Sequence, residues 1–126
     1  MLTAINLPDR PPHPAYSAAV EAKGAARTLY ISGQVGAAAD GSVPAGVGDQ
    51  GKQAIANLNA VLAAAGMTNA NIAKLTIYLT DAAQMGDFYG AAFATLPSPP
   101  PATTLLVVKA LADPALLVEI EAIAVG

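Results

Sequence analysis

Residues 72–79 read IAKLTIYL, and in this stretch apolar residues alternate with lysine, threonine and tyrosine. A period of two predicts a β-strand with one buried face. On each side of it, apolar residues repeat with the period of a helix. One such stripe runs from Asp49 to Gly66, and the other runs from Asp81 until Pro97 stops it. The strand therefore lies between two helices, a pattern typical of a sheet covered by helices.

The rest of the chain contains five further strand candidates. They are residues 2–7, 18–22, 28–32, 104–109 and 117–125. A segment with four prolines, residues 7–14, follows the first of them and favours an extended, stiff connection. The element order is then β-β-β-α-β-α-β-β within a single domain, residues 1–126. Right-handed crossovers would place both helices on one face of one mixed sheet, so we expect an α+β fold.

The second helix carries a stripe of large apolar side chains, and Asp81 with Gln84 resembles a capping box at its start. The members of the stripe are Met85, Phe88, Phe93 and Leu96, with Tyr89 and Ala92 beside them. Helical spacing of this kind is typical of a core-facing side, so we interpret the stripe as core rather than as a cofactor site.

The strand at residues 104–109 presents a packing problem. Leu105 to Val108 are all apolar, so both faces of this strand need cover. Two helices cover only one face of the sheet, and the other face would be a large exposed apolar patch. We infer that a second copy of the chain covers it in a closed symmetric oligomer, with pockets between the subunits.

Composition excludes several classes of protein. The 126 residues include 54% hydrophobic ones, which is too many for a disordered chain, and a net charge of −3 argues against a nucleic-acid partner. Without cysteine and with His13 as the sole histidine, thiol chemistry is excluded and a metal site is not expected. There is no signal-peptide pattern and no long apolar run. We expect a cytoplasmic protein that uses no metal or cofactor.

Two places could carry chemistry on residue type alone. Glu119 and Glu121 share one face of the last strand among apolar neighbours. One interpretation is that they are solvated or salt-bridged groups at a sheet edge. The other is that they act as a general acid/base, because burial would raise their pKa. Ser32 and Gly33 end another strand, which is either an ordinary strand end or a place where a ligand approaches the backbone.

Two further residues each have a structural and a functional interpretation. Thr103 leads from a proline-rich loop into a strand, where threonine suits the strand in any case. Tyr16 follows the N-terminal prolines, and it is either a packing anchor or a ligand contact.

Together these segments resemble the reactive intermediate deaminase family, also called the YjgF family and, in older descriptions, L-PSP endoribonuclease. The segments that carry the resemblance are Tyr16-Ser17, LYISGQVG (29–36), Gln50 through Asn57-Leu58 to Ala65-Gly66, TIYLTD (76–81), FYGAAF (88–93), Pro101-Ala102 and VEIEAIAV (118–125). The resemblance implies a chorismate-mutase-like fold, a homotrimer and a small-molecule cleft between subunits.

The resemblance also implies roles for single residues. Glu119 would orient or activate the water that attacks an imine carbon, so that ammonia leaves. The ligand-binding residues would be Tyr16, Ser32, Gly33, Thr103 and Leu105. In deaminating members an arginine after Pro-Ala holds the substrate carboxylate, and here that position is Thr103. Threonine has no charge and one hydroxyl, so it cannot replace a planar cation with five donors.

Three functions remain open from the sequence. The first is an imine or enamine hydrolase, deaminase-like, with a substrate that does not depend on a carboxylate. The second is a non-catalytic protein that binds a small metabolite. The third is an endoribonuclease or translation inhibitor, against which the charge balance and the lack of a histidine cluster argue.

Overall fold

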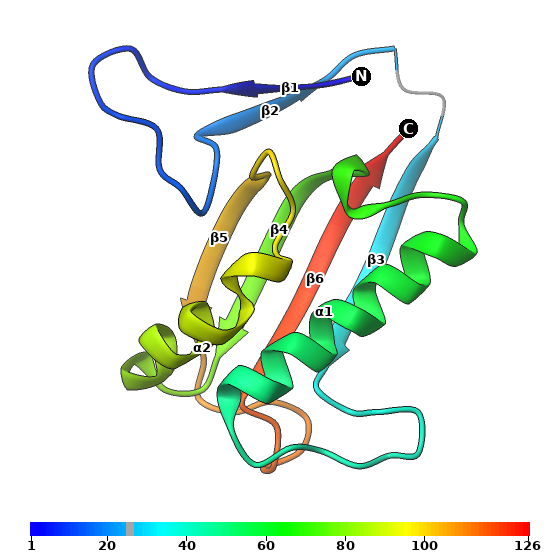
Figure 1. Cartoon of the computed structure of the whole chain (residues 1–126), viewed down its shortest axis with the longest axis vertical. Helices are drawn as coiled ribbons and strands as arrows, with labels where there is room; N and C mark the ends of the chain where they lie inside the picture. Colours follow the sequence, from blue (N-terminus) through cyan, green and yellow to red (C-terminus); the bar gives the residue numbers. More distant parts are fainter. Residues whose placement is uncertain (25–26) are drawn as a thin grey trace.

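The computed structural model describes residues 1–24 and 27–126, and its elements follow the predicted order (Figure 1). The strands are β1 (Leu2–Ile5), β2 (Ala19–Ala22), β3 (Thr28–Val35), β4 (Ile72–Leu79), β5 (Ala102–Val107) and β6 (Val118–Val125). The helices are α1 (Val47–Ala64) and α2 (Met85–Ala92), and short 3-10 turns lie at Asn69–Asn71, Ala82–Gln84 and Phe93–Thr95. The expected α+β class and element order are confirmed.

The main sheet has four strands in the order β3-β6-β4-β5. Strands β4 and β5 are parallel, because α2 connects them by a crossover, and β6 is antiparallel to both of its neighbours. Both helices lie on the same face of this sheet, α2 in front of β4 and β5, and α1 in front of β6 and β3 (Figure 1). This arrangement was predicted.

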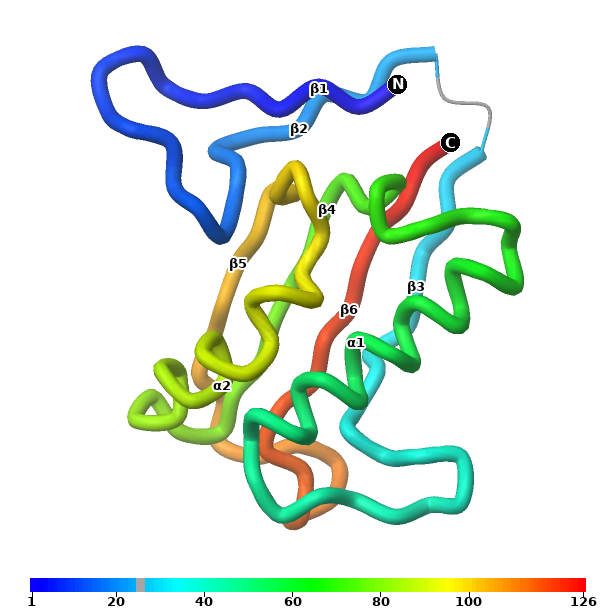
Figure 2. Tube along the Cα trace, in the orientation of Figure 1, coloured from blue at the N-terminus to red at the C-terminus, as the bar shows by residue number. Residues whose placement is uncertain are grey.

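The first two strands differ from the expectation of one continuous sheet. β1 and β2 pair with each other as a separate two-stranded sheet, which lies across one end of the main sheet (Figures 1 and 2). A bridge between Ser17 and Ala102 connects them to β5, where the Ser17 N–H donates to the Pro101 carbonyl at 3.0 Å. The proline-rich segment after β1 returns the chain antiparallel to β1, and β2 pairs with β1 rather than with the main sheet.

The core lies between the helices and the sheet. On β4 the alternation predicted from IAKLTIYL is confirmed, because Leu75, Ile77 and Leu79 are at most 2% exposed. Gly51 lets α1 approach α2 closely, since a Cβ at this position would lie 2.8 Å from the Phe88 ring. The core is therefore tight where the two helices meet.

The observed ends of α1 agree only in part with the ends predicted from Asp49 and Gly66. The helix begins at Val47 with Gly46 as N-cap, and Asp49 lies in the first turn rather than at the cap. At the other end Gly66 has φ +72°, and its N–H donates to the Ala63 carbonyl at 3.0 Å. Only a glycine adopts this left-handed conformation without strain, so the predicted end was correct.

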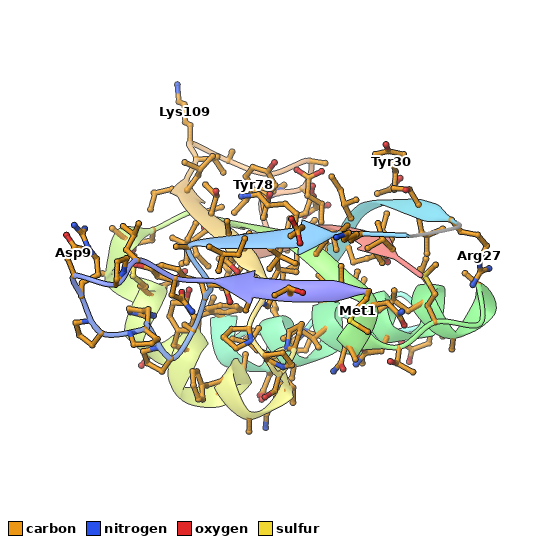
Figure 3. The ribbon with its side chains drawn as sticks, turned by 90° about the horizontal axis from the view of Figure 1, so that it is seen from above. Met1, Asp9, Arg27, Tyr30, Tyr78 and Lys109 are labelled. Carbon is orange, nitrogen blue, oxygen red and sulfur yellow. The ribbon has the colours of Figure 1, made fainter. Side chains whose placement is uncertain are left out.

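The face of the sheet opposite the helices is not covered by any described helix. Tyr30 and Tyr78 project from it (Figure 3), and the exposed fraction is 76% for Tyr30 and 47% for Leu106. Lys74 donates to Thr104 on the same face at 2.6 Å. This open face therefore carries polar and charged side chains beside the apolar ones.

Candidate functional site

A cavity of about 710 Å³ lies between the N-terminal loop, α2 and β5. Its lining consists of His13, Pro14, Ala15, Tyr16, Met85, Tyr89, Gly90, Phe93, Thr103 and Leu105. Three of the predicted ligand-binding residues, Tyr16, Thr103 and Leu105, are therefore close together. A cavity of this volume is within the usual range for sites that bind small organic molecules.

The N-terminal loop forms one wall of the cavity. The ring of His13 stacks on that of Tyr16, with 4.2 Å between the ring centroids and 14° between the planes. The N–H of Ala15 donates to Nδ1 of His13 at 3.0 Å. Next to Tyr16, the Ser17 hydroxyl donates to the Pro100 carbonyl at 2.5 Å and ties the loop to the start of β5. These contacts and the prolines hold Tyr16 in place.

Helix α2 forms the opposite wall. Met85, Tyr89 and Phe93 follow one another at intervals of four residues, so they make one ridge along the helix. Phe88 and Ala92 form the neighbouring ridge and are fully buried, whereas Met85 is 38% and Phe93 47% exposed. The interpretation of the whole stripe as core was therefore wrong for Met85 and Phe93.

The physical reason is the position of α2 beside the edge strand of the sheet. Only one ridge of such a helix can face the sheet and α1, and the next ridge projects past β5 into the cavity. The sequence could have indicated this, because Met85, Tyr89 and Phe93 share one spacing register and Phe88 and Ala92 share another.

Strand β5 supplies the floor of the cavity through Thr103 and Leu105, which point to the helix side of the sheet. The Thr103 hydroxyl donates to the Pro101 carbonyl at 3.2 Å, so its oxygen offers lone pairs rather than a proton to a ligand. Burial raises the pKa of Tyr89, and its neighbour Tyr16 adds to the effect, so Tyr89 stays a neutral phenol. The cavity is lined without any Asp, Glu, Lys or Arg side chain.

The other predicted site residues lie at a bulge in β3. Between Ile31 and Gln34 the register with β6 shifts, so that Ser32 and Gly33 together oppose one residue of β6. The side chain of Glu119 lies against Gly33, and a Cβ at Gly33 would overlap its carboxylate. The structure therefore brings Glu119, Ser32 and Gly33 together, and Gly33 is required by close approach.

Tyr78 and Glu121 accompany Glu119 on the same face of the sheet. The Tyr78 hydroxyl donates to Oε1 of Glu121, and this hydrogen bond is the largest cause of a raised Tyr78 pKa. The carboxylates of Glu121 and Glu119 add to the shift, because they oppose a negative charge on the phenol. Sequence reasoning missed Tyr78 as a partner, although its place in the alternation of β4 puts it on the face of Glu121.

Within one chain the two groups of predicted site residues do not meet. Glu119 pairs with Tyr78 of β4, and Tyr78 pairs with Leu106 of β5. All three side chains therefore lie on the face opposite to Leu105 and the cavity. Strand β4 lies between β6 and β5, so about 10 Å separates these strands within the sheet as well. A ligand in the cavity cannot reach Glu119 of its own subunit through the sheet.

The described residues contain no cluster of three histidine, aspartate or glutamate side chains that could hold a metal ion. No helix in the described ranges has the length and apolar character that crossing a membrane requires. Sequence reasoning singled out neither His13 nor Tyr89 for this site. His13 had no detectable signal beyond its place three residues before Tyr16.

Comparison with known proteins agrees with this fold. A sequence profile described as Endoribonuclease L-PSP matches residues 8–126, which is nearly the whole chain. The chain belongs to the endoribonuclease L-PSP family. This family is the one that the sequence segments resemble, under its older description.

Members of the endoribonuclease L-PSP family with solved structures share the fold. A Yersinia pestis protein of the conserved Rid protein family, YyfB, superposes with a TM-score of 0.83 at 35% identity, and 98% of each chain is covered. RidA from an Antarctic Psychrobacter superposes with a TM-score of 0.73 at 32% identity over 87% of each chain.

The names of two similar proteins refer to an activity and to a location. Protein mmf1, mitochondrial, of Schizosaccharomyces pombe is 34% identical over 97% of this chain and 75% of its own length. The mouse 2-iminobutanoate/2-iminopropanoate deaminase is 45% identical over 58% of this chain, and the match spans 51% of the mouse protein. Since the first of these names refers to mitochondria, the expected cytoplasmic location stays a prediction.

Proposed function

We propose that the protein hydrolyses a small imine, enamine or related carbonyl compound in a cleft between two subunits of a homotrimer. The observation that carries this proposal is the separation of the predicted site residues onto opposite faces of one sheet. One subunit would contribute the cavity with Tyr16, Thr103 and Leu105. Its neighbour would contribute Glu119 with Ser32 and Gly33.

The exposure of large side chains supports assembly through the open face. That face includes Tyr30 at 76% and Leu106 at 47% exposure, which a single subunit leaves in water. Glu119 and Glu121 lie on the same face, so assembly would bring carboxylates to the interface. A closed ring in which each subunit uses two different surfaces gives one composite site per interface.

The residues have the chemistry that imine hydrolysis needs. Glu119 would accept a proton from water while the water oxygen forms a bond to the imine carbon, and it would pass this proton to the imine nitrogen. In the resulting carbinolamine, Glu119 would take the hydroxyl proton and return it to the amine as the C–N bond breaks, so that a carbonyl compound and ammonia leave. Backbone N–H groups at the β3 bulge, beside Ser32 and Gly33, would hydrogen-bond the reacting atoms.

The substrate would differ from that of the relatives named as 2-iminobutanoate/2-iminopropanoate deaminases. Those substrates carry a carboxylate, and the resemblance places an arginine where this chain has Thr103. The uncharged lining around Thr103 supports a substrate without a carboxylate. Cleft, substrate and turnover are the parts of this proposal that need an experiment.

The test measures ammonia release from imines generated in situ by amine and amino acid oxidases. Wild type should accelerate the decay of an uncharged imine, and Glu119→Gln should lose that acceleration by at least about a hundredfold. Glu121→Gln is the matched control, because Glu121 is engaged with Tyr78 and should keep most of the activity. No ammonia release above the background rate would instead favour a protein that only binds a metabolite.

A further inference from the structure

The part of the cavity that one subunit supplies has no charged side chain to balance a full charge on a ligand. Its ten lining residues include no carboxylate, ammonium or guanidinium group. Moving an ionised carboxylate out of water into such a lining is unfavourable unless a partner charge meets it. Aromatic side chains are plentiful, with Tyr16 and His13 on the loop and Tyr89 and Phe93 on α2. Rings on two walls are suited to packing against another ring.

His13 has one nitrogen committed to the loop itself. Its Nδ1 accepts the N–H of Ala15, and an acceptor nitrogen carries no proton. The neutral ring therefore has its proton on Nε2, which makes no hydrogen bond among the described residues. With Nδ1 engaged in this way, Nε2–H is the N–H of this tautomer that no described residue uses.

Building on the proposed function, we propose that the cavity binds an uncharged aromatic ring and that Nε2–H of His13 hydrogen-bonds a polar atom of that ligand. The ring packs among Tyr16, Tyr89 and Phe93. The Thr103 oxygen, whose proton is used by Pro101, accepts a hydrogen bond from the ligand. In this arrangement His13 determines specificity without touching the reacting carbon.

Arg10 is the cation nearest in sequence to this wall. It lines a much smaller cavity of about 70 Å³ that also includes His13 and Tyr16. Its guanidinium is bonded to the Asp9 carboxylate at 3.1 Å, and its side chain is 65% exposed. Arg10 is therefore satisfied by a neighbouring residue and absent from the lining of the large cavity, so it does not anchor a carboxylate there.

Binding of three stable probes distinguishes the effect of an aromatic ring on affinity from the effect of a carboxylate. Phenylacetamide carries an uncharged ring, phenylacetate carries the same ring with a carboxylate, and butyramide is uncharged without a ring. Titration followed by ligand-observed NMR should find phenylacetamide bound about tenfold more tightly than either of the others. Equal or tighter binding of phenylacetate or butyramide, or no binding of phenylacetamide, would overturn the proposal.

Three variants locate the contacts. Phe93→Ala should weaken phenylacetamide binding about tenfold, because the ring loses its stacking partner. His13→Phe keeps an aromatic ring but removes the N–H, so it should weaken phenylacetamide binding by about fivefold. Arg10→Ala, from the same loop, should leave the Kd of all three probes unchanged. The assignment would be contradicted if Arg10→Ala lost phenylacetate binding. It would also be contradicted if Phe93→Ala and His13→Phe bound phenylacetamide as tightly as wild type.

The outcome is distinguishable from failure of the proposed function. Phenylacetamide binding requires no turnover, so it can succeed in a protein that releases no ammonia. Conversely, Glu119-dependent hydrolysis that is as fast on an uncharged aliphatic imine as on an aromatic one would keep the function and reject the ring site.

Discussion

At the scale of single residues, Thr103 decides what the cavity can hold. Its hydroxyl is small, uncharged and already bonded to the Pro101 carbonyl, and the space beside it is about 710 Å³. A longer cationic side chain would therefore fit into the cavity and change its ligand class.

The Thr103→Arg variant should gain affinity for a small carboxylate such as 2-oxobutanoate. Because charge-assisted hydrogen bonds contribute about 1.5–3 kcal/mol, the Kd should fall roughly tenfold to a hundredfold. Isothermal titration measures the change, and Thr103→Met serves as a long but uncharged control. An equal gain in Thr103→Met would show that size rather than charge is responsible.

Tyr78 makes stability depend on pH in the alkaline range. Its pKa is raised above 10.0, first by the hydrogen bond to Glu121 and then by desolvation and the two carboxylates. The folded state therefore holds the phenol proton more tightly than the unfolded chain. This contribution is complete below about pH 10 and is lost as the pH rises through the folded-state value.

We expect the midpoint of urea unfolding to fall more steeply above pH 10 in wild type than in Tyr78→Phe. Burial also raises the pKa of Tyr89. This residue remains in both proteins, so both keep a residual slope of the same sign. Parallel pH profiles for the two proteins would mean that the hydrogen bond from Tyr78 to Glu121 does not stabilise the fold.

The sequence predicted which residues belong to the site, but not on which face of the main sheet each of them lies. Glu119, Gly33 and Ser32 were predicted as site residues, and they lie together at the β3 bulge. What the sequence could not indicate is that Tyr16, Thr103 and Leu105 lie on the other side of the sheet. That follows from the crossover through α2 and from the N-terminal loop, both of which depend on contacts distant in sequence.

At the scale of elements, the close approach of α1 to α2 depends on two glycines of α1. A Cβ at Gly48 would lie 2.7 Å from the Cβ of Ala91, and Gly51 lies against Phe88. A Cβ at Gly51 would lie 2.8 Å from two atoms of the Phe88 ring, and Phe88 is fully buried. The ring cannot shift without disturbing the sheet beneath it. The position of α2, and with it the cavity wall that α2 forms, follows from these contacts.

Gly51→Ala should lower the free energy of unfolding by about 1–3 kcal/mol through overpacking. Gly86→Ala, in the first turn of α2, meets nothing within 4 Å and should be neutral or stabilising by up to about 1 kcal/mol. Denaturant titration of both variants provides the comparison. Equal stability of the two would show that the helices can separate without cost.

The elements were predictable where one local pattern dominates. β4, the C-terminal end of α1 and the element order follow directly from alternation, glycine and helical spacing. The separate β1–β2 sheet and the exposure of Met85 and Phe93 were not predictable in this way. Both depend on which neighbour covers an edge strand, which no local spacing specifies.

At the scale of the whole molecule, one face of the main sheet has no described helix over it, and Tyr30 projects from it 76% exposed. A homotrimer would cover this face. Light scattering should therefore give a mass near three times 12.5 kDa at micromolar concentration. Tyr30→Glu, which places a charge on this face, should shift the mass toward the monomer, and a monomeric wild type would contradict the assembly.

The most direct test of the composite site mixes two impaired variants. Glu119→Gln lacks the acid/base, and Phe93→Ala binds its ligand about tenfold more weakly, so at low substrate concentration each alone should keep at most about a tenth of the activity. If each site takes Glu119 from one subunit and the cavity from the next, random mixing in a trimer makes about a quarter of the sites intact. Co-refolded protein should then recover about a quarter of the wild-type rate of ammonia release, and recovery of none would contradict a site shared between subunits.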